Sequence, residues 1–344
     1  ATSSLASATP VIASSGPASS RASGRPTPMN KDPRPALLCI TPAPAIDRTA
    51  HVERLAHGEV LRPTEMFVLP GGKGVNAARA AVALGGRAVT TGIAGGHAGR
   101  WIVEALSAEG LEPHWAFAKA ESRTAYVTVD EAGQSMLVYE RSTPATPDEY
   151  DAFIRLLEER LLPACARAVV AGSIPSGLPA RRHGEIVEAA RHAGVPLLVD
   201  ASGPGLVAAL EAEPDIVKIG RVEAVESGVA GDDASALDAA VALVERGATL
   251  AVVTDGADEV AAADASATWR LSVPTVEVVN PVGSGDSFNA ALSLALMDGE
   301  DLPTALDRGV AAGTPNALTK SAASLDPLVE SAHEHDVTIT TEER

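Results

Sequence analysis

The stretch NPVGSGDSF, residues 280–288, marks a point where a strand gives way to a helix. Residues 276–279 alternate like the end of a strand, and an apolar run typical of a helix follows at 290–296. Gly283 and Gly285 can adopt backbone angles that other residues avoid, and they let an anion approach the free N–H groups at the helix start. The turn therefore suits a phosphate group.

Asp286 lies in the same turn, and its chemistry allows two interpretations. A carboxylate repels a resting phosphate, but it is well placed as the general base for a hydroxyl that attacks one. Alternatively, the turn is an ordinary Gly-Ser turn in which Asp286 is the helix N-cap.

Short apolar runs alternate with helical patterns from residue 36 onward. Strands are expected at 36–41, 88–93, 168–171, 196–200, 216–219 and 250–254. Helices are expected at 76–84, 100–108, 148–162 and 235–246. This alternation predicts an α/β fold of three layers (α/β/α, Rossmann-like) around a mainly parallel sheet.

Two segments break the alternation. Residues 49–69 lack helical periodicity, and residues 124–139 have the pattern of a hairpin around the turn at 131–134. We expect segments of about 49–69 and 115–141 to form a small β-sheet lid over the carboxyl ends of the main strands, where α/β sheets bind ligands.

Composition limits the classes of function. The chain has 344 residues, 46% of them hydrophobic, and a net charge of −18 argues against nucleic-acid or anionic-membrane partners. Cys39 and Cys165 have the setting of small buried hydrophobes, not of a disulfide or metal pair, which fits a reducing, cytoplasmic location. No apolar run approaches the roughly 18 residues that span a bilayer.

Both ends of the chain differ from its centre. Residues 1–35 are rich in Ser, Ala, Pro and Gly and are expected to be a disordered extension. An organellar transit peptide and a natural start at Met29 are the alternatives. The folded domain is expected to cover 36–335, followed by a C-terminal tail at 336–344.

A second glycine-rich turn, PGGKGVN at residues 70–76, also leads into a helix. It matches neither the Walker loop nor the dinucleotide fingerprint. Its glycines allow close approach to a polyhydroxylated ligand, and Lys73 and Asn76 offer donors, although Lys73 could equally be a solvated loop lysine. A third segment, TPAPAIDR at 41–48, places Asp47 after the first strand, where its carboxylate can accept bonds from sugar hydroxyls.

These three segments in this order resemble the ribokinase-like (PfkB) carbohydrate kinase family, in particular its branch of 1-phosphofructokinase and tagatose-6-phosphate kinase. The resemblance covers about residues 37–327. It rests on GGKGVNAAR at 71–79 and on 280–288, and the segment GSIPSGLP at 172–179, which contains Ser173, also matches that branch.

The resemblance implies a role for each matching residue. Asp286 would be the catalytic base, with Gly283, Ser284 and Gly285 as the anion hole for the transferring phosphoryl group. The substrate-binding residues would be Asp47, Gly72 and Asn76 at the sugar hydroxyls, Lys73 and Arg123 at the existing phosphate, and Ser173. The donor ATP would be bound by Lys218, Thr254, Gly256 and Asn316. Mg²⁺ would be held through phosphate oxygens and water, so no protein metal ligands are expected.

The chain departs from the family pattern mainly on the nucleotide side. Gly220 replaces an Asn, and Asp255 and Glu259 fall within a loop that is usually uncharged; on the sugar side Ala43 replaces an Asn. The added negative charge on the nucleotide side should weaken ATP binding unless Mg²⁺ or Arg221 offsets it.

The leading hypothesis is an ATP-dependent kinase of a ketohexose phosphate: fructose 1-phosphate first, then tagatose 6-phosphate or fructose 6-phosphate. The alternatives are a kinase of an unphosphorylated sugar or nucleoside, and a regulatory protein that binds a sugar phosphate with little turnover. Since lid strands with open edges often pair, a homodimer through the lid is also expected.

Overall fold

The computed structural model describes residues 34–276, 282–317 and 337–344. The expected extension at 1–35, apart from its last two residues, and most of the expected strand end at 276–279 lie outside these ranges. None of the helices in the described part of the chain is long and apolar enough to cross a bilayer.

The main sheet is mixed and mostly parallel, with the strand order β15-β14-β13-β12-β11-β10-β9-β1-β4-β5. Its parallel strands are β1 (Ala36–Thr41), β4 (Arg87–Gly95), β5 (Glu112–Pro113), β6 (Ala116–Ala118, paired with β4), β9 (Arg167–Ala171), β10 (Leu197–Asp200), β11 (Ile216–Gly220) and β12 (Leu250–Asp255). The antiparallel strands are β13 (Glu259–Asp264), β14 (Ala267–Ser272) and β15 (Ile339–Glu343). Every residue of β1 is buried, as an apolar strand in the middle of a covered parallel sheet should be.

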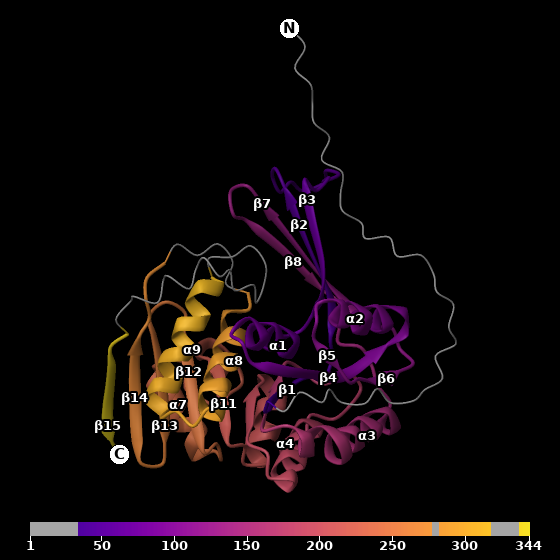
Figure 1. Ribbon diagram of the computed structural model, residues 1–344. Helices are drawn as coiled ribbons and strands as arrows, with labels where there is room; N and C mark the ends of the chain where they lie inside the picture. Colours follow the sequence, from indigo (N-terminus) through magenta and orange to yellow (C-terminus); the bar gives the residue numbers. More distant parts are fainter. Residues whose placement is uncertain (1–33, 277–281, 318–336) are drawn as a thin grey trace. The chain divides into compact units, whose positions relative to one another are not determined.

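Helices cover both faces of this sheet, and Figure 1 shows α1, α8 and α9 on one side with α3 and α4 on the other. The helices are α1 (Lys73–Ala83), α2 (Gly96–Ala108), α3 (Pro147–Leu156), α4 (Arg182–Ala193), α5 (Gly203–Glu211), α6 (Arg221–Glu226), α7 (Ala236–Glu245), α8 (Ser284–Met297) and α9 (Leu302–Asn316). The helix expected at 148–162 changes to a π-helical turn at Leu157–Leu161. The predicted α/β fold is confirmed.

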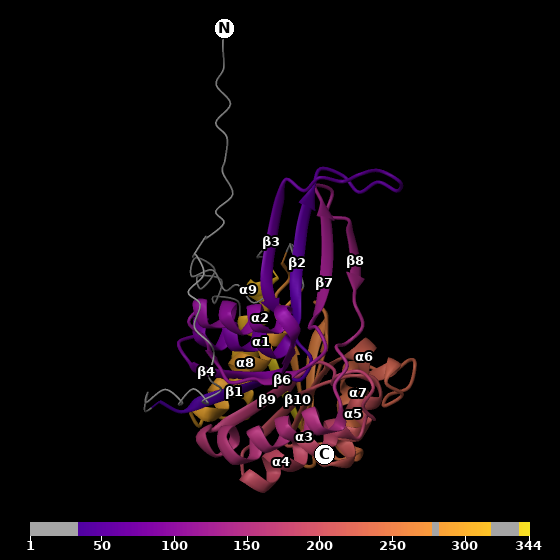
Figure 2. The same cartoon turned by 90° about the vertical axis from the view of Figure 1, so that its right-hand side faces the viewer.

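A separate four-stranded sheet forms the lid, in the order β3-β2-β7-β8 (Figure 2). Its strands are β2 (Ala45–Val52), β3 (Glu65–Gly71), β7 (Arg123–Asp130) and β8 (Ser135–Tyr139). The turn between β7 and β8 falls at the predicted residues, where the Asp130 carboxylate accepts hydrogen bonds from the backbone N–H groups of Ala132 and Gln134.

Three expected boundaries need correction. The lid begins at Ala45 because all of β2 pairs with β3 and β7, so 49 was too late. Its second segment begins at Arg123 and not at 115, because β6 adds to the edge of β4 in the main sheet. The expected tail at 336–344 contains β15, whose Ile339 lies opposite Leu271 of β14, so the main sheet extends to Glu343.

Alanine-rich helices pack on strands of Val, Ile and Leu to form the core. Cys39 is buried and Cys165 is partly buried, and both are free thiols. Burial raises the pKa of both thiols, that of Cys165 to about 12, so neither is activated as a nucleophile.

Candidate active site

The turn at 283–286 begins α8, and Asp286 is the third residue of that helix. Gly283 is the N-cap residue with φ of 94°, a left-handed conformation that glycine adopts without strain. Since the N-cap is Gly283, which has no side chain, the interpretation of Asp286 as an N-cap is wrong. Its carboxylate is instead buried, with 5% of the residue exposed, and is held from another helix.

Asn76 of α1 makes the direct contact with Asp286. Its side-chain Nδ2 donates a hydrogen bond of 2.9 Å to Asp286 Oδ2. Burial, followed by the nearby Asp200, raises the pKa of Asp286 to about 7, although Asn76, Lys73 and Lys218 lower it. A carboxyl group with this pKa can accept a proton near neutral pH, as a general base must.

Asp200, at the carboxyl end of β10, is the centre of a buried polar cluster. It accepts a hydrogen bond of 2.7 Å from Lys73 Nζ and one of 2.8 Å from Asn289 Nδ2, and Lys218 Nζ lies 3.7 Å away. Burial alone would raise the pKa of Asp200, but Lys73 and Lys218 outweigh it and lower that pKa. Asp200 is therefore an anion that fixes two ammonium groups beside Asp286.

Lys73 points toward this cluster. Its ammonium bridges Asp200 and, at 3.3 Å, Glu223, and these two carboxylates raise the pKa of Lys73 despite burial. The expected contact between Lys73 and a substrate phosphate stays a prediction. In the described structure this lysine faces the end of the sheet where Lys218 and Asp286 also lie.

Lys218 of β11 lies against the glycine turn. A Cβ atom at Gly285 would come within 2.5 Å of Lys218 Nζ, so a larger residue here would displace the ammonium group from the turn. Asn316, at the end of α9, braces the same turn through Nδ2, which donates to Val282 O at 2.9 Å and to Ser284 Oγ at 3.1 Å. The expectation for Asn316 was proximity to adenine; its observed contacts are with the turn itself.

A cavity of about 280 Å³ opens beside the turn. Ser284 and Gly285 line it, together with the expected nucleotide-side residues Thr254 and Gly256. The rest of its wall is mostly apolar: Ala257, Val260, Val273, Pro274, Val276, Phe288, Val310, Gly313, Thr314 and Ala317. An apolar slot that ends at a helix N-terminus can take a flat base and aim its phosphates at free N–H groups.

The residues expected on the sugar side meet at the base of the lid. Arg123 begins β7 opposite Ala45 of β2, and Asp47 follows two residues later on β2. Burial raises the pKa of Asp47 to about 6, with Arg79 and Arg123 acting in the opposite direction. A Cβ at Gly72, where φ is 121°, would come within 2.4 Å of Thr41 Cγ2, which explains the glycine.

Ser173 is the second residue after β9, at the same edge of the sheet. Its neighbour Gly172 donates a backbone hydrogen bond of 2.9 Å to Asp200 O. The structure thus brings Asp47, Gly72 and Asn76 together around the start of α1, and Lys73, Lys218 and the glycine turn together around Asp200.

On the nucleotide side, the residues that depart from the family pattern each have a hydrogen-bond or ion-pair partner. Asp255, at the end of β12, accepts a bond of 2.6 Å from Arg221 Nε. Glu259 forms an ion pair of 2.6 Å with Arg270. Gly220 donates its backbone N–H to Glu223 Oε2 at 3.1 Å. The two added carboxylates are therefore each paired with an arginine.

Three residues of the site were given no role from the sequence: Asp200, Asn289 and Arg79, which contacts Asn76. Asp200 had a usable signal, because it ends the apolar strand expected at 196–200 and so lies at the ligand-binding edge. Asn289 gave none, since its partner is 89 residues away in the chain, whereas Arg79 stands in the segment GGKGVNAAR, three residues after Asn76, and was given no role.

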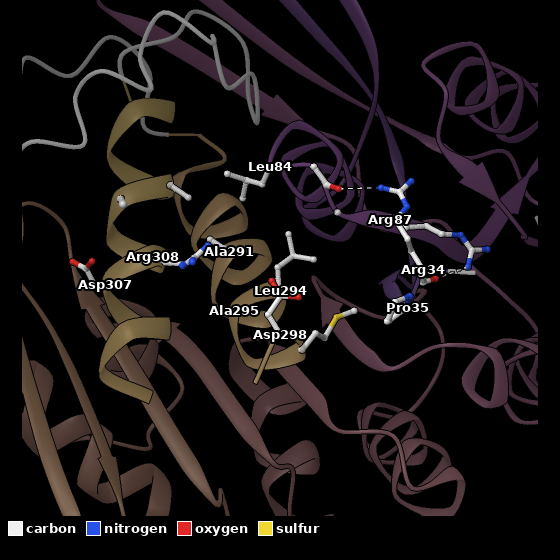
Figure 3. Close-up of a pocket in the computed structure, with 15 residues that line it drawn as sticks. Arg34, Pro35, Leu84, Arg87, Ala291, Leu294, Ala295, Asp298, Asp307 and Arg308 are labelled. Carbon is white, nitrogen blue, oxygen red and sulfur yellow. Dashed lines mark hydrogen bonds between the residues drawn. The ribbon is translucent and has the colours of Figure 1, made fainter. Parts of the chain in front are cut away.

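A larger cavity, of about 550 Å³, contains none of the expected site residues (Figure 3). It lies where the end of α1 meets α8 and α9, and its charged residues are of both signs. They are Arg34, Arg87, Arg308, Asp298 and Asp307. Size alone therefore does not identify the site in this chain.

Comparison with known proteins shows the family and the fold of the chain. The family described as pfkB family carbohydrate kinase matches residues 36–327. The tetrameric inhibited form of phosphofructokinase-2 from Escherichia coli is similar, with a TM-score of 0.78 and 26% identity, over 88% of this chain and 100% of that one. That enzyme in complex with fructose-6-phosphate gives a TM-score of 0.76 and 26% identity, over 88% and 99%. A possible 1-phosphofructokinase from Thermotoga maritima shares the fold, with a TM-score of 0.78 and 23% identity, over 90% and 99%.

Proposed function

Because this chain belongs to the PfkB family of carbohydrate kinases, we propose that it transfers the γ-phosphoryl group of ATP to a hydroxyl of a ketohexose phosphate, with Asp286 as general base. The observation that carries this proposal is the environment of Asp286. Its buried carboxylate is held by Asn76, and it lies in the same turn as Ser284 and Gly285, which line the apolar cavity.

The transfer needs one proton acceptor and a site for the negative charge of the phosphoryl group. The acceptor oxygen of the sugar forms a bond to the γ-phosphorus while its proton passes to Asp286, and the bond from that phosphorus to the β–γ bridging oxygen breaks, releasing ADP. The N–H groups of Gly283, Ser284 and Gly285 would stabilise the charge on the phosphoryl oxygens, with Lys218 beside them.

Lys218 lies beside the glycine turn, where the donor's polyphosphate would lie. This position suits a nucleotide bound with Mg²⁺, which would be held mainly through phosphate oxygens and water and would offset part of the phosphate charge. The ion pairs of Asp255 with Arg221 and of Glu259 with Arg270 also support an active enzyme, because they offset the added negative charge that motivated a binding-only role.

A phosphorylated acceptor is supported by Arg123, whose guanidinium lies at the base of the lid near Asp47. Arginine binds phosphate bidentately, which suits a substrate that already carries one. Fructose 1-phosphate is the first candidate, followed by tagatose 6-phosphate and fructose 6-phosphate; phosphofructokinase-2 from Escherichia coli, a relative, has been crystallised with the last of these.

The test is a screen of sugar phosphates, free sugars and nucleosides with ATP and Mg²⁺, in which ADP is read by a coupled assay and the product by ³¹P NMR. We expect turnover with a ketohexose phosphate. Arg123→Ala should then raise KM for that substrate on the order of tenfold or more, since a hydrogen-bonded charge pair is lost. Turnover only with an unphosphorylated acceptor, unaffected by Arg123→Ala, would replace this proposal with the second kinase hypothesis.

A further inference from the structure

Arg79 lies one turn after Asn76 on α1, and its guanidinium contacts three neighbours. Nη1 donates a hydrogen bond of 3.2 Å to Asn76 Oδ1. Nε and Nη2 bind the carboxylate of Glu109, at 2.7 and 3.1 Å, and Nη2 also donates to Pro70 O. The arginine therefore touches the same side chain that holds Asp286, from the opposite end of its amide.

We propose that Arg79 is a positioning residue, which sets the orientation of the Asn76 amide so that its Nδ2, and not its Oδ1, faces the carboxylate of Asp286. This inference rests on the proposed role of Asp286 as the base. A side-chain amide has a donor end and an acceptor end, and rotation by 180° exchanges them. A guanidinium only donates, so Asn76 must present its oxygen to Arg79 and its NH₂ group to Asp286.

Arg79 can impose this orientation because it is itself fixed. Its side chain is 15% exposed, and Glu109, the C-cap residue of α2, holds it through two nitrogens in the bidentate geometry that arginine favours. Pro70 of β3 accepts a further bond from it. The start of α1, the end of α2 and the last residues of a lid strand are thus joined through one guanidinium.

The orientation matters for proton transfer. A donor that faces a carboxylate stabilises its ionised form, whereas an amide oxygen that faces it destabilises that form. The other charged groups that face Asp286 come from different elements: Asp200 from β10, Lys218 from β11, and Lys73 from the start of α1. None of these three is bonded to Arg79, so a change at Arg79 leaves them in place. Arg79 does lower the pKa of Asp47, and the NMR titration of Asp286 itself separates the two carboxylates.

Arg79→Met removes the donor while keeping an unbranched side chain. Without Arg79, the amide of Asn76 is no longer held with its NH₂ group toward Asp286. We expect the acid limb of the pH profile of kcat/KM to move up by about one pH unit, because the loss of the hydrogen bond from Asn76 to the charged Asp286 carboxylate is worth roughly that much. At pH 6 the activity should fall on the order of tenfold, and it should recover above pH 8, where Asp286 is ionised in any case. Arg79→Leu, which also lacks a donor, should give the same shift if the methionine variant does not fold.

Arg182→Met is the matched control. Its side chain is 14% exposed and forms ion pairs with Asp151 and Glu185, but it lies far in the chain from the glycine turn and contacts neither Asn76 nor Asp286. The Arg182→Met variant should lose a similar amount of unfolding free energy to Arg79→Met and should leave the acid limb of the pH profile unchanged. If Arg79 had a purely structural role, Arg79→Met would also leave the acid limb unchanged and would lower activity by the same factor at every pH. That result would overturn the inference.

A second readout does not depend on turnover. The pKa of Asp286 can be followed by ¹³C NMR titration of the carboxyl carbons, with the signal assigned by its loss in Asp286→Asn. A higher pKa in Arg79→Met than in the wild type supports the inference even if no sugar is phosphorylated, in which case only the proposed function fails. An unchanged pKa in a protein that does turn over refutes the inference and leaves the function standing.

Discussion

Asp286 combines two properties that oppose each other: it is buried, and it must be able to carry charge. Burial disfavours the carboxylate, while Asn76 and the two lysines favour it, and the balance raises its pKa to about 7. The stability of the fold is affected as well, because a carboxyl group whose pKa is raised by folding favours the folded state only while it is protonated. Function and stability therefore meet at this one residue.

Asp286→Asn should remove activity and increase stability. The amide cannot accept the proton, so kcat should fall by roughly 10²–10⁴-fold, while the affinity for the sugar phosphate, measured by calorimetry, should be nearly unchanged. At pH 8 the melting temperature should rise, because the wild type pays for an ionised buried carboxylate there and the variant does not. Wild-type turnover in the variant would rule out Asp286 as the base.

The pH dependence of stability has a definite sign at this residue. The pKa of Asp286 is about 7 in the folded protein against an ordinary value of 3.8 for this side chain, so its stabilising contribution is complete below pH 3.8 and is lost as the pH rises through 7. The difference in unfolding free energy between Asp286→Asn and the wild type should therefore grow between pH 4 and pH 8. Urea titrations of both proteins at several pH values measure it, and a difference that stays constant over this range contradicts the raised pKa.

The ion pair of Arg221 with Asp255 leads to a prediction about the donor side. Arg221→Gln should leave Asp255 uncompensated near the ATP phosphates and raise KM for ATP by roughly three- to tenfold, since partly exposed pairs are worth about 1 kcal/mol. Asp255→Asn should not raise it, and the double variant should return close to the wild type. KM for the sugar should stay constant in all three, and the effect should shrink in high salt. Equal losses in both single variants would mean that the pair only supports the loop.

At the scale of elements, continuous apolar runs predicted the buried parallel strands correctly, because a strand covered on both faces needs no polar alternation. β1 and β9 begin and end within a residue of their expected bounds. The short strands β5 and β6 and the edge strand β15 escaped prediction, since each has only two to five residues, and their pairing depends on an edge supplied by the rest of the sheet.

The candidate site also has features that the sequence predicts and features that it does not. The glycine turns were predictable, because the positive φ of Gly72 and Gly283 and the close approach of Gly72 to Thr41 keep glycine in the sequence. Side-chain partners from distant segments were not, because no local pattern records that Asn76 meets Asp286 or that Arg221 meets Asp255.

The contact of α4 with α5 contains a histidine that makes stability sensitive to acid. His183 is buried with no hydrogen-bond partner for either ring nitrogen among the described residues, and burial lowers its pKa to about 4. Since the unfolded value is about 6.5, its protonation favours unfolding, and stability should fall by up to about 3 kcal/mol as the pH drops from 6.5 to 4. His183→Leu should remove this part of the acid sensitivity. His192→Leu, on the exposed face of the same helix, is the control that should not, and unfolding by urea at pH 7 and pH 4.5 compares all three proteins. Equal acid sensitivity in the wild type and His183→Leu would show that the ring is not the cause.

At the scale of the whole molecule, the lid has two different faces. Strand alternation and register place Met66, Tyr126, Met136 and Val138 on the face opposite Asp47, and all four are between 44% and 56% exposed. Leu137 and Tyr139, which are 50% and 56% exposed, lie on the same face as Asp47, so the outer set differs from them in its spread over three strands and not in its exposure. An exposed apolar set drawn from three strands of a sheet with open edges is typical of a surface that pairs with another chain.

We expect this outer face to form a homodimer, and the two faces supply a matched pair of variants. Val138→Asp should convert the dimer to a monomer in sedimentation experiments, because it places a charge in the apolar contact. Leu137→Asp puts the same charge at the neighbouring position on the inner face, so it should leave the dimer intact. It should instead weaken sugar-phosphate binding, since a carboxylate on the face that carries Asp47 repels the substrate's phosphate. A wild-type monomer at micromolar concentration, or a dimer that survives Val138→Asp, would show that the outer face has another purpose. If Leu137→Asp alone disrupted the dimer, the subunits would meet through the inner face, and the sugar site would then be shared between them.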